Sequence, residues 1–210
     1  KMNDIGFWEP RNTITYSQFQ NGYHQYEIFE YLGLHEDFMQ RAALAVAQLA
    51  DRDGHFSPYP GGGGCYDYDA GAILLAAKRV SGSTEFDSIL KKLSNAIISE
   101  QKKDGGFAET LIFRPYNLAR VGNIIRHITT GPISSIPEKV HKISSLSRPS
   151  FSRISTHWSA YPRKWIESNL WDSWFRMMIA ARIQMSFDNK YSCNWNNIEF
   201  PGIGYFQKYQ

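Results

Sequence analysis

The chain has 210 residues, of which 42% are hydrophobic and 15% aromatic, and its formal net charge is +3. This small charge, without a dense run of Lys and Arg, gives no indication of a nucleic-acid partner, and two cysteines without CxxC spacing, Cys65 and Cys193, indicate neither a disulfide scaffold nor a zinc ribbon. Because no apolar run approaches the roughly 20 residues of a membrane span, we expect one soluble, cytoplasmic domain over residues 1–210 without a membrane span.

Four glycines beside aromatic residues mark the chain, at Gly6, Gly54, Gly106 and Gly204. Their intervals are 48, 52 and 98, and 98 is close to two periods of 49. One copy of the mark, near residue 155, is therefore missing. A period near 50 with helical pattern between the marks is the length of one helical hairpin and its loop. The sequence thus predicts an all-α fold of about four hairpins joined by glycine and aromatic loops.

The first hairpin is predicted from two adjacent patterns. Residues 20–32 carry aromatic and acidic side chains at helical spacing, and Gly33 ends that helix. Glu36 and Asp37 lie in the first turn of the next helix, where the helix dipole favours acids. A single apolar stripe then follows, made of Phe38, Ala42, Ala45, Val46 and Leu49.

The second hairpin is predicted over residues 66–80 and 85–100. Its second helix has a capping pattern formed by Thr84 and Asp87. The apolar stripe of this helix consists of Phe86, Ile89, Leu90, Leu93 and Ile97.

The rest of the chain is less regular. Residues 116–127 and 138–146 are predicted to be helical, followed by an irregular stretch to Pro162. Ser168 or Asn169 then caps a helix that reads LWDSWFRMMIAARI. This helix is apolar almost all round, so we expect an inner helix enclosed on every side.

Hairpins of this kind can bury their stripes only against neighbouring hairpins, which predicts two circular layers of helices. Gln48 with Asp53-Gly54-His55-Phe56, and Gln101 with Asp104-Gly105-Gly106-Phe107, resemble the QW-type repeats of the squalene cyclase and protein prenyltransferase superfamily. The resemblance implies an α/α toroid, partial or complete, with a central cavity. Complete members carry five to seven hairpins, so we expect this chain to be the C-terminal part of a longer one.

The same resemblance suggests catalytic roles for two acidic residues, Asp67 and Asp69. Class II terpene cyclases of the superfamily have a DxDD motif whose middle Asp protonates the substrate. Asp67-Tyr68-Asp69-Ala70 is similar, so Asp69 matches the proton donor and Asp67 the first Asp, whereas Ala70 replaces the third. A general acid needs a pKa raised by burial or by a neighbouring carboxylate. The alternative is structural: Asp67 caps the helix and Asp69 lies in its first turn.

Protein prenyltransferases hold zinc through Asp, Cys and His, which suggests a second alternative. Cys65 and Asp69 are four residues apart and share a helix face, and His157 would supply the third ligand. No paired zinc-ligand motif is present. We therefore expect no cofactor and no metal, with Cys65 as a small buried apolar residue.

The segment from His157 to Arg176 contains four tryptophans among acids and bases. Asp172 and Arg176 share one helix face and are expected to pair with each other or with a ligand. The segment resembles uncharacterised bacterial proteins with prenyltransferase/squalene-oxidase repeats, which share an ESxLWxSWFR-like segment and a C-terminal PGxGYF. Those proteins are often encoded near cell-surface polysaccharide genes. The alternative is a tryptophan-rich packing surface with a buried ion pair.

Together these patterns predict an acidic, aromatic-lined cavity for a small-molecule, glycan or lipid-linked ligand. One hypothesis is an enzyme that acts on a glycan or an isoprenoid, and the other is a non-catalytic glycan-binding or scaffold module of the same fold. The candidate catalytic residues are Asp67, Asp69, Glu167 and Asp172. The candidate substrate-binding residues are Tyr23, His24, His157, Trp158, Tyr161, Arg163, Trp165, Trp171 and Arg176.

Overall fold

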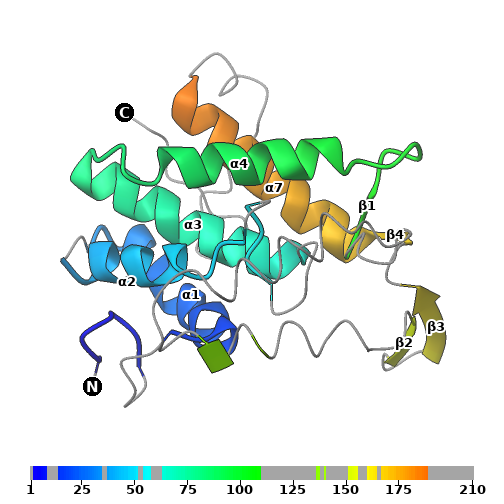
Figure 1. The fold of residues 1–210 in the computed structure, drawn as a ribbon, viewed down its shortest axis with the longest axis horizontal. Helices are drawn as coiled ribbons and strands as arrows, with labels where there is room; N and C mark the ends of the chain where they lie inside the picture. The colour runs from blue at the N-terminus through cyan, green and yellow to red at the C-terminus, as the bar shows by residue number, and fades with distance from the viewer. Residues whose placement is uncertain are drawn as a thin grey trace.

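The computed structural model describes residues 2–8, 14–34, 37–51, 54–57, 63–109, 136–137, 140, 151–155, 160–164 and 167–188. Within these ranges the chain is mostly helical (Figure 1), as expected. The helices are α1 (Tyr16–Tyr31), α2 (Asp37–Ala47), α3 (Gly64–Ser81), α4 (Asp87–Ser99) and α7 (Leu170–Phe187). The strands are β1 (Phe107–Ala108), β2 (Phe151–Ser155), β3 (Ala160–Lys164) and β4 (Ser168–Asn169).

The first predicted hairpin is confirmed as α1 and α2. Helix α1 begins four residues earlier than expected because Thr15 and Gln18 form a capping box, in which each side chain accepts the other's backbone N–H. Gly33 follows the helix with a φ of +66°, a conformation that glycine adopts without strain. The predicted stripe of α2 is buried.

The second predicted hairpin is confirmed as α3 and α4, but its capping prediction is wrong. The N-cap of α4 is Phe86, which makes no side-chain capping bond. The Asp87 carboxylate accepts a hydrogen bond from Lys78 Nζ at 2.5 Å and so ties α4 to the end of α3. The apolar stripe is nonetheless buried through Phe86, Leu90, Leu93 and Ile97.

The predicted cap of α7 is confirmed, whereas its complete enclosure is not. Asn169 Oδ1 accepts the Asp172 backbone N–H and starts the helix. One side of the helix is buried through Phe175, Ile179 and Ile183. Leu170 is 85% exposed and Trp171 59% exposed, so the first turns reach solvent despite their apolar sequence.

Helix α3 is the centre of the helical assembly (Figure 1). It packs against α1, α2 and α7, and α7 also packs against α4. Gly71 allows α3 to pack closely against α7, because an added Cβ would lie 2.6 Å from Ile179 Cδ1. Helix α7 thus packs against α3 and α4 in the same way that α3 packs against α1 and α2.

One loop conformation occurs three times, before α1, between α2 and α3, and after α4. Asn3, Asp51 and Lys102 each donate their backbone N–H to the carbonyl oxygen four residues later. The glycine at the third position after each of them has a positive φ, and these glycines are Gly6, Gly54 and Gly105. The sequence-based choice of Gly106 as the third mark is therefore off by one residue, because the positive φ belongs to Gly105. Gln101 Nε2 also donates to the Gly105 carbonyl.

The repeat is interrupted between the third loop and α7. Trp8 precedes Tyr16 by eight positions and Phe56 precedes Gly64 by eight, whereas Phe107 precedes Leu170 by 63. Strands β2 and β3 pair antiparallel within this segment, away from the helices in Figure 1, so the prediction of an irregular stretch is wrong there. Residues 136–137 and 140 are helical, and the predicted helix 116–127 lies outside the described residues.

Strands β1 and β4 close the interrupted segment. Phe107 pairs with Asn169 and Ala108 pairs with Ser168, in antiparallel register. Ser168 Oγ also donates to Asp104 Oδ1, and the Phe107 N–H is bound by Ser173 Oγ. The third loop is thereby held directly against the start of α7.

Candidate functional site

Asp67, in the first turn of α3, is completely buried in a hydrogen-bond network. Its Oδ1 accepts the Phe56 N–H at 2.8 Å, and its Oδ2 accepts His55 Nδ1 at 2.8 Å. The N-cap of α3 is Gly63, so the alternative in which Asp67 caps the helix is wrong. The helix begins at Gly64, three residues before Asp67. Asp67 instead fixes the second loop against α3.

Arg176 of α7 joins the same network from the other side. Its Nη1 donates to Glu100 Oε2 at 3.0 Å and lies 3.9 Å from Asp67 Oδ2, and its Nη2 donates to the Glu109 carbonyl at 2.9 Å. The guanidinium is 1% exposed. Arg176 was expected to pair with Asp172 or a ligand, and the structure shows it bonded to Glu100, the C-cap of α4, and to the Glu109 carbonyl after β1.

The charge of His55 is set by two acids. Burial alone would lower its pKa, but Asp67 and Glu100 outweigh burial and raise the pKa to about 10. His55 Nε2 lies 3.5 Å from Glu100 Oε1. At neutral pH the imidazole is therefore cationic, and two cations offset two buried carboxylates. This network of His55, Asp67, Glu100 and Arg176 joins three helices and has the character of a structural ion cluster.

Asp69 stands apart from that cluster. It lies one turn further along than Cys65, its side chain is 4% exposed, and no hydrogen-bond donor among the described residues reaches its carboxyl group. Burial, and next the nearby Glu27, raise the pKa of Asp69 well above its ordinary value. Asp69 therefore keeps its proton to a higher pH than an ordinary carboxylic acid does.

Glu27 of α1 is the second acid of this region. Burial raises its pKa, and the Tyr23 hydroxyl, which donates to Glu27 Oε1 at 3.1 Å, partly offsets that effect. His24 Nδ1 lies 3.8 Å from Glu27 Oε2, with the imidazole largely exposed. Two carboxyl groups with raised pKa values thus come from neighbouring helices, α1 and α3.

A chain of polar contacts runs from Glu27 across three helices. The Tyr23 hydroxyl lies 3.3 Å from the Tyr68 hydroxyl, which accepts Arg182 Nη1 of α7 at 3.1 Å. Arg182 Nη2 lies 3.6 Å from Glu30, and Arg79 also binds Glu30. The tyrosine rings meet edge to face, with centroids 5.5 Å apart. The α1–α3–α7 interface is therefore polar at its centre.

Cys65 lies in the first turn of α3, close to Asp172 in the first turn of α7. Burial, followed by the charges of Asp69, Asp172 and Glu109, raises the pKa of the Cys65 thiol to about 12. Gln20 Nε2 donates to Cys65 Sγ at 3.4 Å. Asp172 Oδ1 accepts the Gly64 N–H at 3.0 Å, so this acid ties the first turn of α7 to the first residue of α3.

The structure brings together some predicted site residues and separates others. Tyr23, Cys65, Asp67, Asp69, Asp172 and Arg176 gather around the first half of α3. Glu167 is exposed beside β4, and Trp171 is exposed with its ring against Phe175. His157, Trp158 and Trp165 lie outside the described residues, and of Tyr161 and Arg163 only the β3 backbone is described.

Sequence reasoning missed the partners of these residues. Glu27 was counted in a helical pattern and not as a site residue, although it lies one turn from Tyr23 on the same face. His55 belongs to the second loop, and Glu100 is the C-cap of α4, two residues before the third loop begins at Lys102. Their positions close to the glycine marks that follow α2 and α4 were the available signal that they would lie near the same neighbouring helices.

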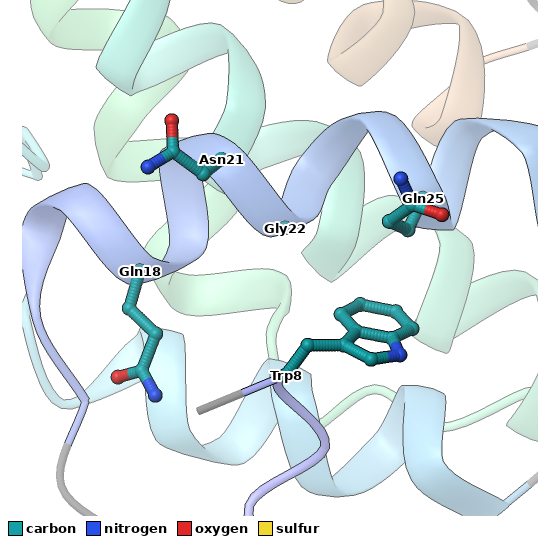
Figure 2. Close-up of a pocket in the computed structure, with 5 residues that line it drawn as sticks. All are labelled: Trp8, Gln18, Asn21, Gly22 and Gln25. Carbon is teal, nitrogen blue, oxygen red and sulfur yellow. The ribbon is translucent and has the colours of Figure 1, made fainter. Parts of the chain in front are cut away.

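An open pocket of about 420 Å³ lies on the other side of α1 (Figure 2). Trp8, Gln18, Asn21, Gly22 and Gln25 line it. Trp8 comes from the first loop and the other four from α1. None of these residues was a candidate from the sequence, because amides on a helix carry no recognisable spacing signal.

The described ranges contain no group of three or more His, Cys, Asp and Glu side chains placed to hold a metal ion, and His157, the proposed third zinc ligand, is not among them. No helix in the described part of the chain is long and apolar enough to cross a membrane.

Comparison with known proteins finds no matching family model, no matching curated protein and no matching solved structure.

Proposed function

We propose that this chain is part of an α/α toroid in which Asp69 acts as a general acid on a glycan. The observation that carries the proposal is the contrast within one motif: Asp69 is buried with a raised pKa and no donor among the described residues, while Asp67 is bound on both oxygens. A general acid at neutral pH must retain its proton, and burial without a counter-cation favours that.

The order of helix packing supports the toroid. In an α/α toroid, consecutive inner helices pack on one another, and each outer helix packs on the next inner helix. Helices α1, α3 and α7 form such a consecutive series, and α2 and α4 pack on α3 and α7 respectively. With this assignment, Asp69 and Glu27 lie on inner helices, next to one another along the arc.

The neighbours of Asp69 favour a polyhydroxylated substrate over an isoprenoid. Glu27, the Tyr23 hydroxyl and the Gln20 amide are polar groups that can bind sugar hydroxyls. An isoprenoid cation would require an apolar aromatic wall at the same place. In glycoside cleavage, Asp69 would donate its proton to the leaving-group oxygen, and Glu27 would serve as the second carboxyl group. The substrate oxygen would reach Asp69 through its 4% exposed surface.

The test is turnover of a neutral and acidic oligosaccharide panel by wild type and Asp69→Asn, followed as release of reducing ends. We expect Asp69→Asn to lower turnover at least about 100-fold, the usual contribution of a general acid, with the helical circular-dichroism signal intact. Asp37→Asn is the matched control, because Asp37 is also a helical acid but lies exposed in the first turn of α2. Its activity should equal that of wild type.

The alternative is a non-catalytic glycan-binding module, which the open pocket lined by Trp8 and three amides favours. Binding of a panel oligosaccharide without release of reducing ends, unchanged in Asp69→Asn, would support the module and rule out the catalytic role of Asp69.

A further inference from the structure

The pocket at Trp8 is separate from the acids of α3. Its α1 residues, Gln18, Asn21, Gly22 and Gln25, follow one another at intervals of three and four positions and so form one stripe of the helix. Gln20, Tyr23 and Glu27 lie on the opposite stripe, which faces α3. A ligand in the pocket would therefore contact none of the groups that surround Asp69.

The first loop supplies the pocket's aromatic wall. Trp8 packs edge-on against Tyr26, with ring centroids 5.7 Å apart, and at 5.8 Å against Phe29. The ring is nevertheless 38% exposed. Gly22 allows this arrangement, because an added Cβ would lie 2.7 Å from Phe7 Cδ1 and would push the loop away from α1. Trp8 is thus held rigidly with part of its ring open to the pocket.

Gln18 supplies an independent indication of a ligand. Its Oε1 is engaged in the capping box with the Thr15 N–H, which fixes the amide. Its Nε2 is buried, and no acceptor among the described residues binds it. The Gln18 side chain is 4% exposed and lines the pocket (Figure 2). A buried amide donor without an acceptor is costly unless another molecule supplies the oxygen.

We propose that this pocket binds one neutral sugar unit. The described residues that line the pocket carry no charge, so none of them would pair with an ionic ligand. Asn21 and Gln25 are exposed amides that can both donate and accept, as vicinal hydroxyl groups require. The exposed ring of Trp8 offers a flat apolar surface to the C–H face of a pyranose, and a volume of about 420 Å³ suits a sugar of one or two rings.

The test is an NMR titration of the whole chain with glucose, galactose, N-acetylglucosamine, cellobiose and glucuronate, following the Trp8 indole and the Asn21 and Gln25 side-chain amides. We expect at least one neutral sugar to shift all three signals with saturable binding. Asn21→Ala and Gln25→Ala should each weaken that binding about threefold to tenfold, the usual effect of one lost hydrogen bond.

Two control variants show whether the binding belongs to this pocket. Asn95→Ala removes an exposed amide from α4 and should leave the affinity unchanged, and Asp69→Asn should also leave it unchanged, even if that variant loses activity. The proposal is overturned if no neutral sugar shifts these signals at tens of millimolar, if glucuronate binds more tightly than every neutral sugar, or if both amide variants bind as wild type does.

Discussion

Asp67 and Asp69 are two residues apart in α3, and their carboxyl groups lie in opposite environments. Asp67 accepts hydrogen bonds from a cationic imidazole and a backbone N–H, whereas the Asp69 carboxyl has no donor among the described residues and lies near a second acid, Glu27. The environments of the two acids differ because each side chain contacts a different element. Asp67 contacts the second loop, and Asp69 lies near α1.

This difference predicts opposite effects of the same substitution. Asp67→Asn leaves His55 and Arg176 with less compensating negative charge in a buried network, and we expect it to lower the free energy of unfolding by about 3–5 kcal/mol. Asp69→Asn replaces a carboxyl group whose pKa is raised by burial with a near-isosteric neutral amide, and its cost should stay below about 1 kcal/mol. Urea unfolding of both variants at pH 7 measures the difference, and equal costs would contradict the assignment.

His55 predicts a loss of stability in the alkaline range. Its pKa is about 10 in the folded chain, against an ordinary value of 6.5. The folded state therefore holds the proton more tightly, and the stabilisation is fully present below pH 6.5 and is lost as the pH rises towards 10. Unfolding free energies measured across this range should fall for wild type. His55→Gln should be less stable at pH 6 and show a flatter profile, and a slope that persisted unchanged in the variant would assign the effect to another group.

The raised pKa of Asp69 predicts that stability also falls with rising pH in the acidic range. Because its folded pKa is raised above the ordinary value of 3.8, the folded state binds more protons than the unfolded state as the pH rises above that value. Burial of this carboxyl therefore costs progressively more stability with rising pH, until the folded pKa is passed. The difference in unfolding free energy between Asp69→Asn and wild type should grow in favour of the variant from pH 4 upward. A constant difference would mean that the Asp69 pKa is not raised.

Gly54 and Gly105 allow a matched test of the repeated loop. Both have a positive φ, at +96° and +84°, so Ala at either position costs about 1–2 kcal/mol in backbone strain. A Cβ on Gly54 would also lie 2.8 Å from the Leu93 backbone nitrogen, whereas Gly105 has open space around it. We expect Gly54→Ala to destabilise the chain by about 2 kcal/mol more than Gly105→Ala in thermal or urea unfolding. Equal costs would show that the loop does not press on α4.

The sequence predicted the helical framework well because periodic burial leaves a local pattern. The stripes of α2 and α4, the end of α1 at Gly33 and the Asn169 cap of α7 all depend on residues within a few positions. The start of α4 was misjudged because Asp87 is drawn to Lys78 of another helix. The exposed turns of α7 were misjudged because hydrophobicity alone does not say which neighbours are present.

The candidate site was predicted only in part, for a similar reason. The DYD motif identified Asp67 and Asp69, but their separate environments depend on His55 and Glu27, which come from elements 12 residues and 42 residues earlier in the chain. Arg176 was placed on the correct helix, but its pairing with Glu100 was not predicted, because Glu100 is distant in sequence. Charge pairing between elements follows from packing, and the sequence shows only which charges are available.

The pairing of β1 with β4 has an evolutionary consequence. Because Ala108 and Ser168 are strand partners, the two ends of the segment between them are held side by side at one point of the helical framework. A change in the length of that segment would therefore leave the distance between its two ends unchanged. The strand pair is thus a point at which chain length can change in evolution while the third loop stays next to the start of α7.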